Sequence, residues 1–281
     1  MKKIITSIVT ICIVFNSFIL SVSAATKAEG YAIYRDGAGI NFDWHAGFIY
    51  NALYHSANTV IHVDNGANGN SDSTDFLIND VSLSEFINNQ QFYGYYIPNS
   101  FSLLSDNEIA SIKNNVIITI NKLKQINKDD LKYNVAFQIW YNNDRDQDGK
   151  VDTDEITSMR CDGLIEYCYE SLGYMIFSGD ISTFDTSIRN AHSGTNITPK
   201  KQATLHMHNC LGDIDYNCSV TAADGRLAMR IVSGIESYDK YQEFVLDVNG
   251  DEILNAADSR LILQYSSNII DIFPADPLVA E

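Results

Sequence analysis

The sequence predicts an α+β fold in two parts, a larger mixed domain followed by a small all-α domain. Three observations predict it. The chain of 281 residues is long enough for one large domain and one small one. The first half of the chain contains several short segments with the length of strands and one long segment with the pattern of an amphipathic helix. Near the C-terminus, a segment with a helical pattern occurs twice.

Residues 1–25 have the features of a secretory signal peptide. Lys2 and Lys3 precede an unbroken apolar run, which ends in small residues at Ala25. We therefore expect a secreted, extracellular protein, attached to a cell surface or a complex, with no membrane contact after cleavage. The alternative is an uncleaved membrane anchor. No later segment is long and apolar enough to cross a bilayer.

The composition excludes one class of partner. The formal net charge is −17, and loss of two lysines with the signal peptide lowers it by two, to −19. So acidic a protein is not expected to bind nucleic acid or anionic membranes by general electrostatics. Four cysteines remain after the signal peptide, too few for a disulfide scaffold, with one conceivable bridge between Cys210 and Cys218.

The larger domain is expected to span residues 26–205. Its expected strands are His45–Tyr50, Thr59–Asp64, Phe92–Ile97 and Tyr133–Tyr141. A helix is expected over Asp106–Gln125, with Ser105 and Glu108 as its capping box. The segment from Ser187 to Leu211 is polar and indicates a linker, which is expected to end at residues 206–211.

An EF-hand-like calcium loop is expected between these strands and the next helix. Oxygen ligands fall at its positions 1, 3, 5, 7, 9 and 12, the seventh through a backbone carbonyl: Asp144, Asp146, Asp148, Lys150, Asp152 and Glu155. Gly149 fills the sixth position, where the loop turns sharply. The alternative is a solvated acidic turn. We expect one structural Ca²⁺ ion here, which fixes the entry to the helix that follows.

Three side chains in the larger domain are of the types that form a cysteine hydrolase site. Cys161 is expected in the first turn of a helix capped by Ser158, where the helix dipole favours a thiolate. His45 and His62 lie on two apolar strands. These types suit a nucleophile, a base and a residue that orients the base. The alternative is that all three are packing residues.

The motifs around these side chains resemble those of a known family. His-Ala-Gly-Phe-Ile-Tyr (45–50), Val-Ile-His-Val (60–63) and Cys-Asp-Gly-Leu-Ile-Glu-Tyr (161–167) resemble the histidine strands and nucleophile helix of NlpC-type cysteine hydrolases. The histidines precede the cysteine, as in the circularly permuted branch. The resemblance implies a permuted papain-like domain that hydrolyses an amide or ester in a peptide, peptidoglycan or cell-wall substrate.

The oxyanion of such a reaction needs hydrogen-bond donors. The backbone amide of Cys161 is expected to be one donor, with the hydroxyl of Tyr31 or Tyr34 as a weaker candidate.

The repeat near the C-terminus contains two further calcium loops at a spacing of 34 residues. Oxygen ligands again fall at positions 1, 3, 5, 7, 9 and 12. In the first loop they are Asp213, Asp215, Asn217, Ser219 (through its carbonyl), Thr221 and Asp224. In the second they are Asp247, Asn249, Asp251, Ile253 (through its carbonyl), Asn255 and Asp258. Two Ca²⁺ ions are therefore expected, each beside a short amphipathic helix.

The two loop–helix units, residues 212–272, resemble a type I dockerin, and residues 273–281 are expected to form a C-terminal tail. The resemblance implies docking to a cohesin module of a scaffoldin, in an extracellular polysaccharide-degrading complex of the cellulosome type. It also implies that the partner contacts Ala222, Ala223, Arg226, Ala256, Ala257 and Arg260. Cys218 and Glu252 depart from the family, because glycine is usual at the sixth loop position.

The sequence thus predicts a secreted cysteine hydrolase docked through a calcium-dependent dockerin. Two other classes remain open. One is a non-catalytic binding module carried into the same complex. The other is a glycoside hydrolase, which would need two facing carboxylates, and no pair outside the calcium loops stands out.

Overall fold

The computed structural model describes residues 28–37, 44–50, 59–63, 78–126, 131–134, 136–194, 196–238 and 240–276. The predicted signal peptide lies outside this part of the chain. Within the described residues, no helix has the length and apolar character needed to span a membrane.

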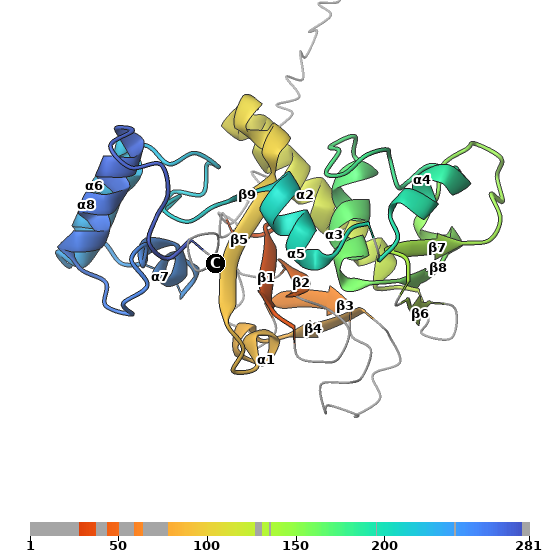
Figure 1. The fold of residues 1–281 in the computed structure, drawn as a ribbon, viewed down its shortest axis with the longest axis horizontal. Helices are drawn as coiled ribbons and strands as arrows, with labels where there is room; N and C mark the ends of the chain where they lie inside the picture. Colours follow the sequence, from red (N-terminus) through yellow and green to blue (C-terminus); the bar gives the residue numbers. More distant parts are fainter. Residues whose placement is uncertain are drawn as a thin grey trace, which may run out of the picture.

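The predicted α+β class is confirmed, with two sheets (Figure 1). The larger sheet has the strand order β4-β3-β2-β1-β5-β9, and every neighbouring pair in it is antiparallel. The smaller sheet has the order β6-β8-β7. The strands are β1 (Ala32–Asp36), β2 (Trp44–Ile49), β3 (Val60–Val63), β4 (Ile78–Val81), β5 (Phe92–Pro98), β6 (Lys132–Tyr133), β7 (Ile139–Tyr141), β8 (Ile156–Met159) and β9 (Met207–Asn209).

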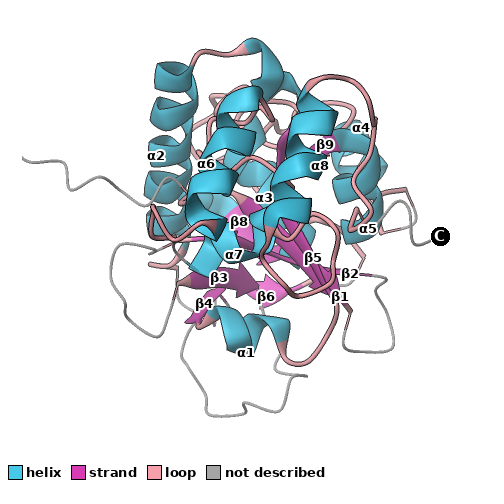
Figure 2. Ribbon diagram, turned by 90° about the vertical axis from the view of Figure 1, so that its left-hand side faces the viewer, coloured by secondary structure: helices cyan, strands magenta, loops and turns pink. Residues whose placement is uncertain are grey.

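Helices cover the sheets and form the end of the molecule opposite the smaller sheet (Figures 1 and 2). They are α1 (Leu83–Ile87), α2 (Asp106–Leu123), α3 (Cys161–Glu170), α4 (Thr186–Ala191), α5 (Pro199–Lys201), α6 (Ala222–Val232), α7 (Lys240–Leu246) and α8 (Ala256–Ser266). Short 3₁₀ turns lie at Asn99–Leu103 and Thr153–Glu155, and a π-helical turn lies at Gln202–His206.

The two faces of the larger sheet have different neighbours. Phe48 of β2 contacts Tyr169 of α3, with ring centroids 5.4 Å apart. Gly47 points to the opposite face, where an added Cβ would lie 3.0 Å from the Phe86 ring of α1. Because neighbouring strand residues alternate between faces, Ala46 shares the α3 face with Phe48, and His45 shares the α1 face with Gly47.

Most of the predicted elements of the larger domain are present. The expected strands β2, β3 and β5 and the helix α2 are confirmed. The single strand expected over Tyr133–Tyr141 is wrong, because β6 and β7 are separate and both pair with β8. The Asn134 side chain accepts hydrogen bonds from the amides of Ala136 and Phe137, which turns the chain between them.

The predicted linker from Ser187 to Leu211 is also wrong. The segment contains α5, which begins at a Thr198 cap with Pro199 in its first turn. It then forms the π-helical turn and β9, which pairs with β5 as the edge strand of the larger sheet (Figure 1). The expected domain end at residue 205 and the linker end at 206–211 therefore fall inside the folded domain.

The C-terminal part is all-α, as predicted. Helices α6 and α8 lie side by side (Figures 1 and 2). Gly225 allows their close contact, since a Cβ there would lie 2.5 Å from the Leu263 side chain. Phe273 is buried and stacks on Tyr265, with centroids 4.5 Å apart, so the expected tail begins with a packed residue. Residues 277–281 lie outside the described chain.

The C-terminal part packs directly on the larger sheet. The Tyr31 hydroxyl before β1 donates a hydrogen bond of 3.1 Å to Asp213, at the first position of a predicted calcium loop. The rings of Phe92 in β5 and Phe244 in α7 lie 4.9 Å apart. With β9 in the sheet as well, the two parts form a continuous packed structure.

Candidate functional site

The structure brings His45 and His62 together. Gly47 of β2 pairs with His62 of β3, so His45 and His62 lie on the same face two residues apart in register. His45 Nε2 lies 2.8 Å from His62 Nδ1. The pKa of His45 is held well below its usual range by burial, and further by His62 and Arg35. His45 is therefore a neutral imidazole near pH 7.

Cys161 is the first residue of α3, and Arg160 occupies the cap position without a side-chain hydrogen bond that caps the helix. The predicted Ser158 cap is wrong, because Ser158 lies in β8 opposite Trp140. The Cys161 sulfur accepts hydrogen bonds from the amides of Ala46 and Asp162. Because Ala46 follows His45 directly, the thiol reaches the strand that carries the predicted base.

The thiol and the histidines are not on a shared face of the sheet. The His45 ring stacks on Phe86 of α1 at 5.5 Å, and His62 meets the same ring at 5.7 Å. Helix α3 covers the other face. Pairing of β2 with β3 starts at Gly47. Cys161 contacts β2 at Ala46, one residue before that pairing begins.

The expected thiolate at the start of the helix is not favoured here. Cys161 is fully buried, and burial raises the pKa of its thiol to about 12, with a further increase from Asp162. The Ala46 amide and Arg160 act in the opposite direction but are weaker. The shifts at Cys161 and His45 both favour neutral groups, so this site holds a thiol and an imidazole.

The hydroxyl groups expected at the oxyanion have other partners. Tyr31 binds Asp213, and Tyr34 donates to Gln202 Oε1 at 2.7 Å and contacts the Met207 sulfur at 3.0 Å. The tyrosine at the thiol is Tyr133 of β6, whose hydroxyl hydrogen-bonds Cys161. No sequence signal indicated Tyr133, since it is distant in sequence and on the smaller sheet.

The three predicted calcium loops have left-handed residues at the same two positions. In each loop the fourth and sixth residues have a positive φ. These residues are Gln147 and Gly149, Tyr216 and Cys218, and Gly250 and Glu252. Cys218 and Glu252 therefore adopt, at φ 67° and 62°, the left-handed conformation that glycine supplies in the first loop.

The three loops also share one hydrogen-bond pattern. The first carboxylate accepts the amide of the sixth residue, at 3.0 Å in Asp144, 2.9 Å in Asp213 and 3.0 Å in Asp247. The carboxylate at the twelfth position accepts the amide of the ninth, as Glu155 does from Asp152. Each loop is thus wrapped around its own acidic side chains.

Two of the loops bring three carboxylates within 4.8 Å of one another. The groups are Asp144, Asp146 and Asp148, and Asp213, Asp215 and Asp224. Asp144 Oδ1 is buried and makes no hydrogen bond. Repulsion among close carboxylates favours a cation between them, and a hard oxygen set suits Ca²⁺. The donor sets therefore fit the predicted ion.

The second repeat loop allows a test of this backbone assignment. We expect Glu252→Gly to stabilise the protein by about 1 kcal/mol, because the left-handed conformation costs a residue with a Cβ about that much. Thermal unfolding in saturating Ca²⁺ measures the effect. Glu252→Ala is the matched control, since it removes the same charge but keeps the Cβ. Equal melting temperatures for the two variants would contradict the assignment.

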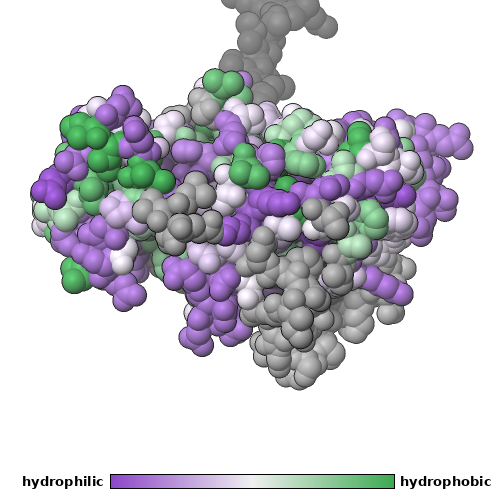
Figure 3. Space-filling view, viewed as in Figure 1, coloured by the Kyte–Doolittle hydropathy of each residue, from purple (hydrophilic) through white to green (hydrophobic). Residues whose placement is uncertain are grey.

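The residues expected to contact a partner lie at the starts of α6 and α8. Ala222, Arg226, Ala256 and Arg260 are exposed, whereas Ala223 and Ala257 are half-buried. Hydrophobic side chains gather on this end of the molecule (Figure 3). Met229 of α6 is exposed as well.

The state of the cysteines differs from the bridge that the sequence left open. Cys161, Cys168, Cys210 and Cys218 are free, so the bridge considered between Cys210 and Cys218 is not formed.

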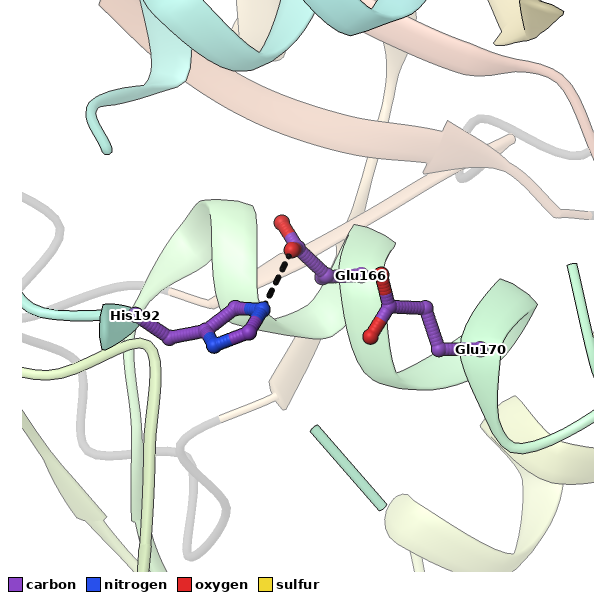
Figure 4. Close-up of side chains that lie close together, drawn as sticks. All are labelled: Glu166, Glu170 and His192. Atoms are coloured by element: carbon purple, nitrogen blue, oxygen red, sulfur yellow. Dashed lines mark ion pairs between the residues drawn. The ribbon is translucent and has the colours of Figure 1, made fainter. Parts of the chain in front are cut away.

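A buried cluster on α3 joins Glu166, Glu170 and His192 (Figure 4). Its sequence signal is the spacing of two glutamates four residues apart on an apolar helix.

No family model matches the chain, and neither a search of curated proteins nor one of solved structures finds a match.

Proposed function

We propose that the protein is a secreted cysteine hydrolase of the permuted papain-like type, which cleaves an amide or ester bond. The observation that carries the proposal is the contact of the Cys161 sulfur with the Ala46 amide, beside a His45–His62 pair held at 2.8 Å. A nucleophile, a base and a group that orients the base are the parts such a reaction needs.

The neutral state of both groups indicates the order of proton transfer. As the Cys161 sulfur forms its bond to the substrate carbonyl carbon, the thiol proton passes to His45, whose ring must first leave its position on Phe86 to reach the sulfur on the other face of the strand. His62 holds the resulting imidazolium through the contact at 2.8 Å. His45 then gives the proton to the leaving amine or alcohol as the tetrahedral intermediate collapses to a thioester. Water hydrolyses the thioester, with His45 again as base, and restores the thiol.

Two residues beside the sulfur support the developing negative charge. The Asp162 amide, at the start of α3, already donates to the sulfur, and the Tyr133 hydroxyl contacts it too. We propose these two donors for the oxyanion beside the Cys161 amide, and in place of Tyr31 and Tyr34, whose hydroxyl groups bind Asp213 and Gln202. The geometric requirement is a donor within hydrogen-bond distance of the oxyanion.

Activity assays of matched cysteine variants test this proposal. We expect the wild type to hydrolyse members of a library of peptides, muropeptides and esters, and Cys161→Ala to be inactive. Cys168→Ala is the control, because Cys168 is also fully buried on α3 but has no proposed role. Loss of activity in both variants, or in neither, would contradict the proposed nucleophile.

We assign Ca²⁺ to the three acidic loops, and the loop at 144–155 has a direct connection to the nucleophile helix. The Tyr167 hydroxyl of α3 donates a hydrogen bond of 2.7 Å to the carbonyl of Val151 in this loop. The chain runs from Glu155 through β8 straight to Arg160. An ion in the loop would therefore hold both the entry and one side of α3.

The connection predicts a joint effect on stability and turnover. Glu155→Gln is expected to lower both, because it weakens the ligand that ends the loop, and a small misplacement of a nucleophile costs about 10²-fold in rate. Excess Ca²⁺ is expected to restore both. Asp154→Asn is the matched control, since the Asp154 side chain is 71% exposed beside it. A turnover unaffected by Glu155→Gln would contradict the connection.

The C-terminal part is proposed to dock the enzyme to a cohesin module of a scaffoldin. The support is the duplicated loop and helix, with equivalent residues exposed at the starts of α6 and α8. Because the two copies present similar surfaces, changing Ala222 and Ala223 together is expected to weaken binding little. Changing Ala256 and Ala257 as well is expected to abolish it.

Binding assays against a panel of type I cohesins measure these two steps. Complete loss with the first pair alone would show that only one copy faces the partner.

A second candidate function is a non-catalytic binding module delivered to the same complex. It is favoured by the complete burial of Cys161 and by the position of His45 on the sheet face that α3 does not cover. The two functions differ in the library assay described above. Among the described residues, the buried pair Glu166 and Glu170 does not support a glycoside hydrolase, because both lie on one helix rather than facing each other across a cleft.

A further inference from the structure

A buried cluster beneath the larger sheet joins two acidic side chains and one histidine. Glu166 and Glu170 lie one turn apart on α3, and His192 follows the last residue of α4 (Figure 4). One ligand atom of each residue lies within 4.8 Å of the others. All three side chains are at most 1% exposed. The cluster lies outside the proposed catalytic site and the three acidic loops.

The charges inside the cluster do not balance. The neighbouring Arg160 is held by Asp162, with contacts of 2.5 and 2.6 Å, and so is neutralised there. The neutral amides of Gln138 and Gln202 donate to Glu166 Oε2, at 2.7 and 2.6 Å. Glu170 accepts the backbone amides of Ile176, Phe177 and Ile181, at 2.9, 3.1 and 2.9 Å, which stabilise its charge without neutralising it. Two buried negative charges therefore remain, and two protons or one divalent cation can neutralise them.

The histidine is oriented as a metal ligand is. His192 Nδ1 lies 2.8 Å from the carbonyl oxygen of Ile188, and a proton shared there leaves the lone pair on Nε2. His192 Nε2 faces Glu166 Oε1 at 3.0 Å. Both atoms are buried, and neither makes a hydrogen bond of ordinary geometry. Two lone pairs that face each other at this distance need a cation or a proton between them.

We infer that Glu166, Glu170 and His192 bind a divalent transition-metal ion, for which Zn²⁺ is the test ion. An imidazole with two carboxylates suits zinc, whereas Ca²⁺ takes oxygen ligands. The ion would tie the end of α4 to the middle of α3. This site goes beyond the proposed hydrolase and does not depend on it.

Protonation is the competing explanation. Burial raises the pKa of Glu170 to about 8, with a further increase from Glu166. Burial lowers the pKa of His192, but contact with Glu166 more than offsets this and raises it. A neutral Glu170 beside a His192–Glu166 ion pair would also balance the charges.

Metal content of the full chain decides between them. Because the site is buried, the ion must enter during folding, so the protein is produced in zinc-supplemented medium and dialysed against Ca²⁺ buffer. We expect one zinc ion per chain in the wild type and none in His192→Gln or Glu170→Gln. His208→Gln is the matched control, since His208 lies on β9 outside the cluster, and it should keep the zinc.

Two results would overturn the site. One is a wild-type protein without zinc, which means that protons balance the charges. The other is zinc that stays in both His192→Gln and Glu170→Gln, which means that it binds elsewhere. Since the variants could fail to fold, production of the wild type in cobalt gives a second measurement. The visible absorption of a protein-bound Co²⁺ ion is expected, and its absence contradicts the site.

Discussion

The full chain moved from millimolar Ca²⁺ into EDTA is expected to lose most of its folding free energy. An ion present at 1,000 times its Kd contributes about 4 kcal/mol. Three such sites contribute about as much as the whole stability of an ordinary domain, roughly 5–15 kcal/mol. Scanning calorimetry in Ca²⁺ and in EDTA measures the loss, and Mg²⁺ in place of Ca²⁺ is the control.

The loss is expected to include the larger domain. Tyr31 binds Asp213, Phe92 contacts Phe244, and β9 of the sheet leads into the first repeat loop. A loop that unfolds therefore removes contacts from the sheet, and we expect one transition for the whole chain. An unchanged melting temperature in EDTA would contradict the calcium assignment. A C-terminal transition that leaves the rest of the chain unaffected would contradict the coupling.

The largest expected effect on turnover comes from the proposed catalytic residues. Cys161→Ala is expected to reduce kcat by about 10⁴-fold or more, and His45→Ala by about 10²–10⁴-fold. Together they should cost little more than Cys161→Ala alone, because the residues act as a unit. His62→Ala should cost less, since it only orients His45. Single-turnover kinetics on the best library substrate measures all four variants, and additive losses would contradict a shared step.

The pH dependence of this reaction has a definite sign. The base must be neutral, and burial, His62 and Arg35 hold the pKa of His45 below its usual 6.5. Activity is therefore expected to persist as the pH falls through 6.5 and to decline only below it. An acid limb of kcat/KM above 6.5 would exclude His45, in the environment described here, as the base.

The acidic loops could be predicted well because their information is local. Each loop places its ligand residues within one short stretch of sequence. The spacing alone therefore indicated which positions hydrogen-bond each other in the structure, such as the Asp144 carboxylate and the Gly149 amide. The position of glycine was less informative, since Cys218 and Glu252 adopt the same left-handed backbone without it. At both residues the backbone amide donates to the first carboxylate of the loop, which holds the turn without glycine.

The errors arose where the contacts are long-range or the segment is polar. The stretch up to Leu211 looked like a linker because few of its side chains are apolar, yet Met207 and Cys210 are buried. The Tyr133 contact with Cys161 and the Glu166 contact with His192 join residues from different elements. Periodicity within one element carries no information on such pairs.

The buried thiol also changes the choice of reagent. A nucleophile with a thiolate would react fast with iodoacetamide near neutral pH. Burial raises the pKa of Cys161 to about 12, so slow alkylation is expected even if Cys161 is the nucleophile. An acyl donor that uses His45 to remove the proton is the better probe.

Mass spectrometry of acid-quenched protein after mixing with an activated acyl ester tests the central claim most directly. The account predicts a thioester on the peptide that contains Cys161 in the wild type and in Cys168→Ala, formed much more slowly in His45→Ala. No acylation of Cys161, or acylation at the same rate without His45, would contradict it.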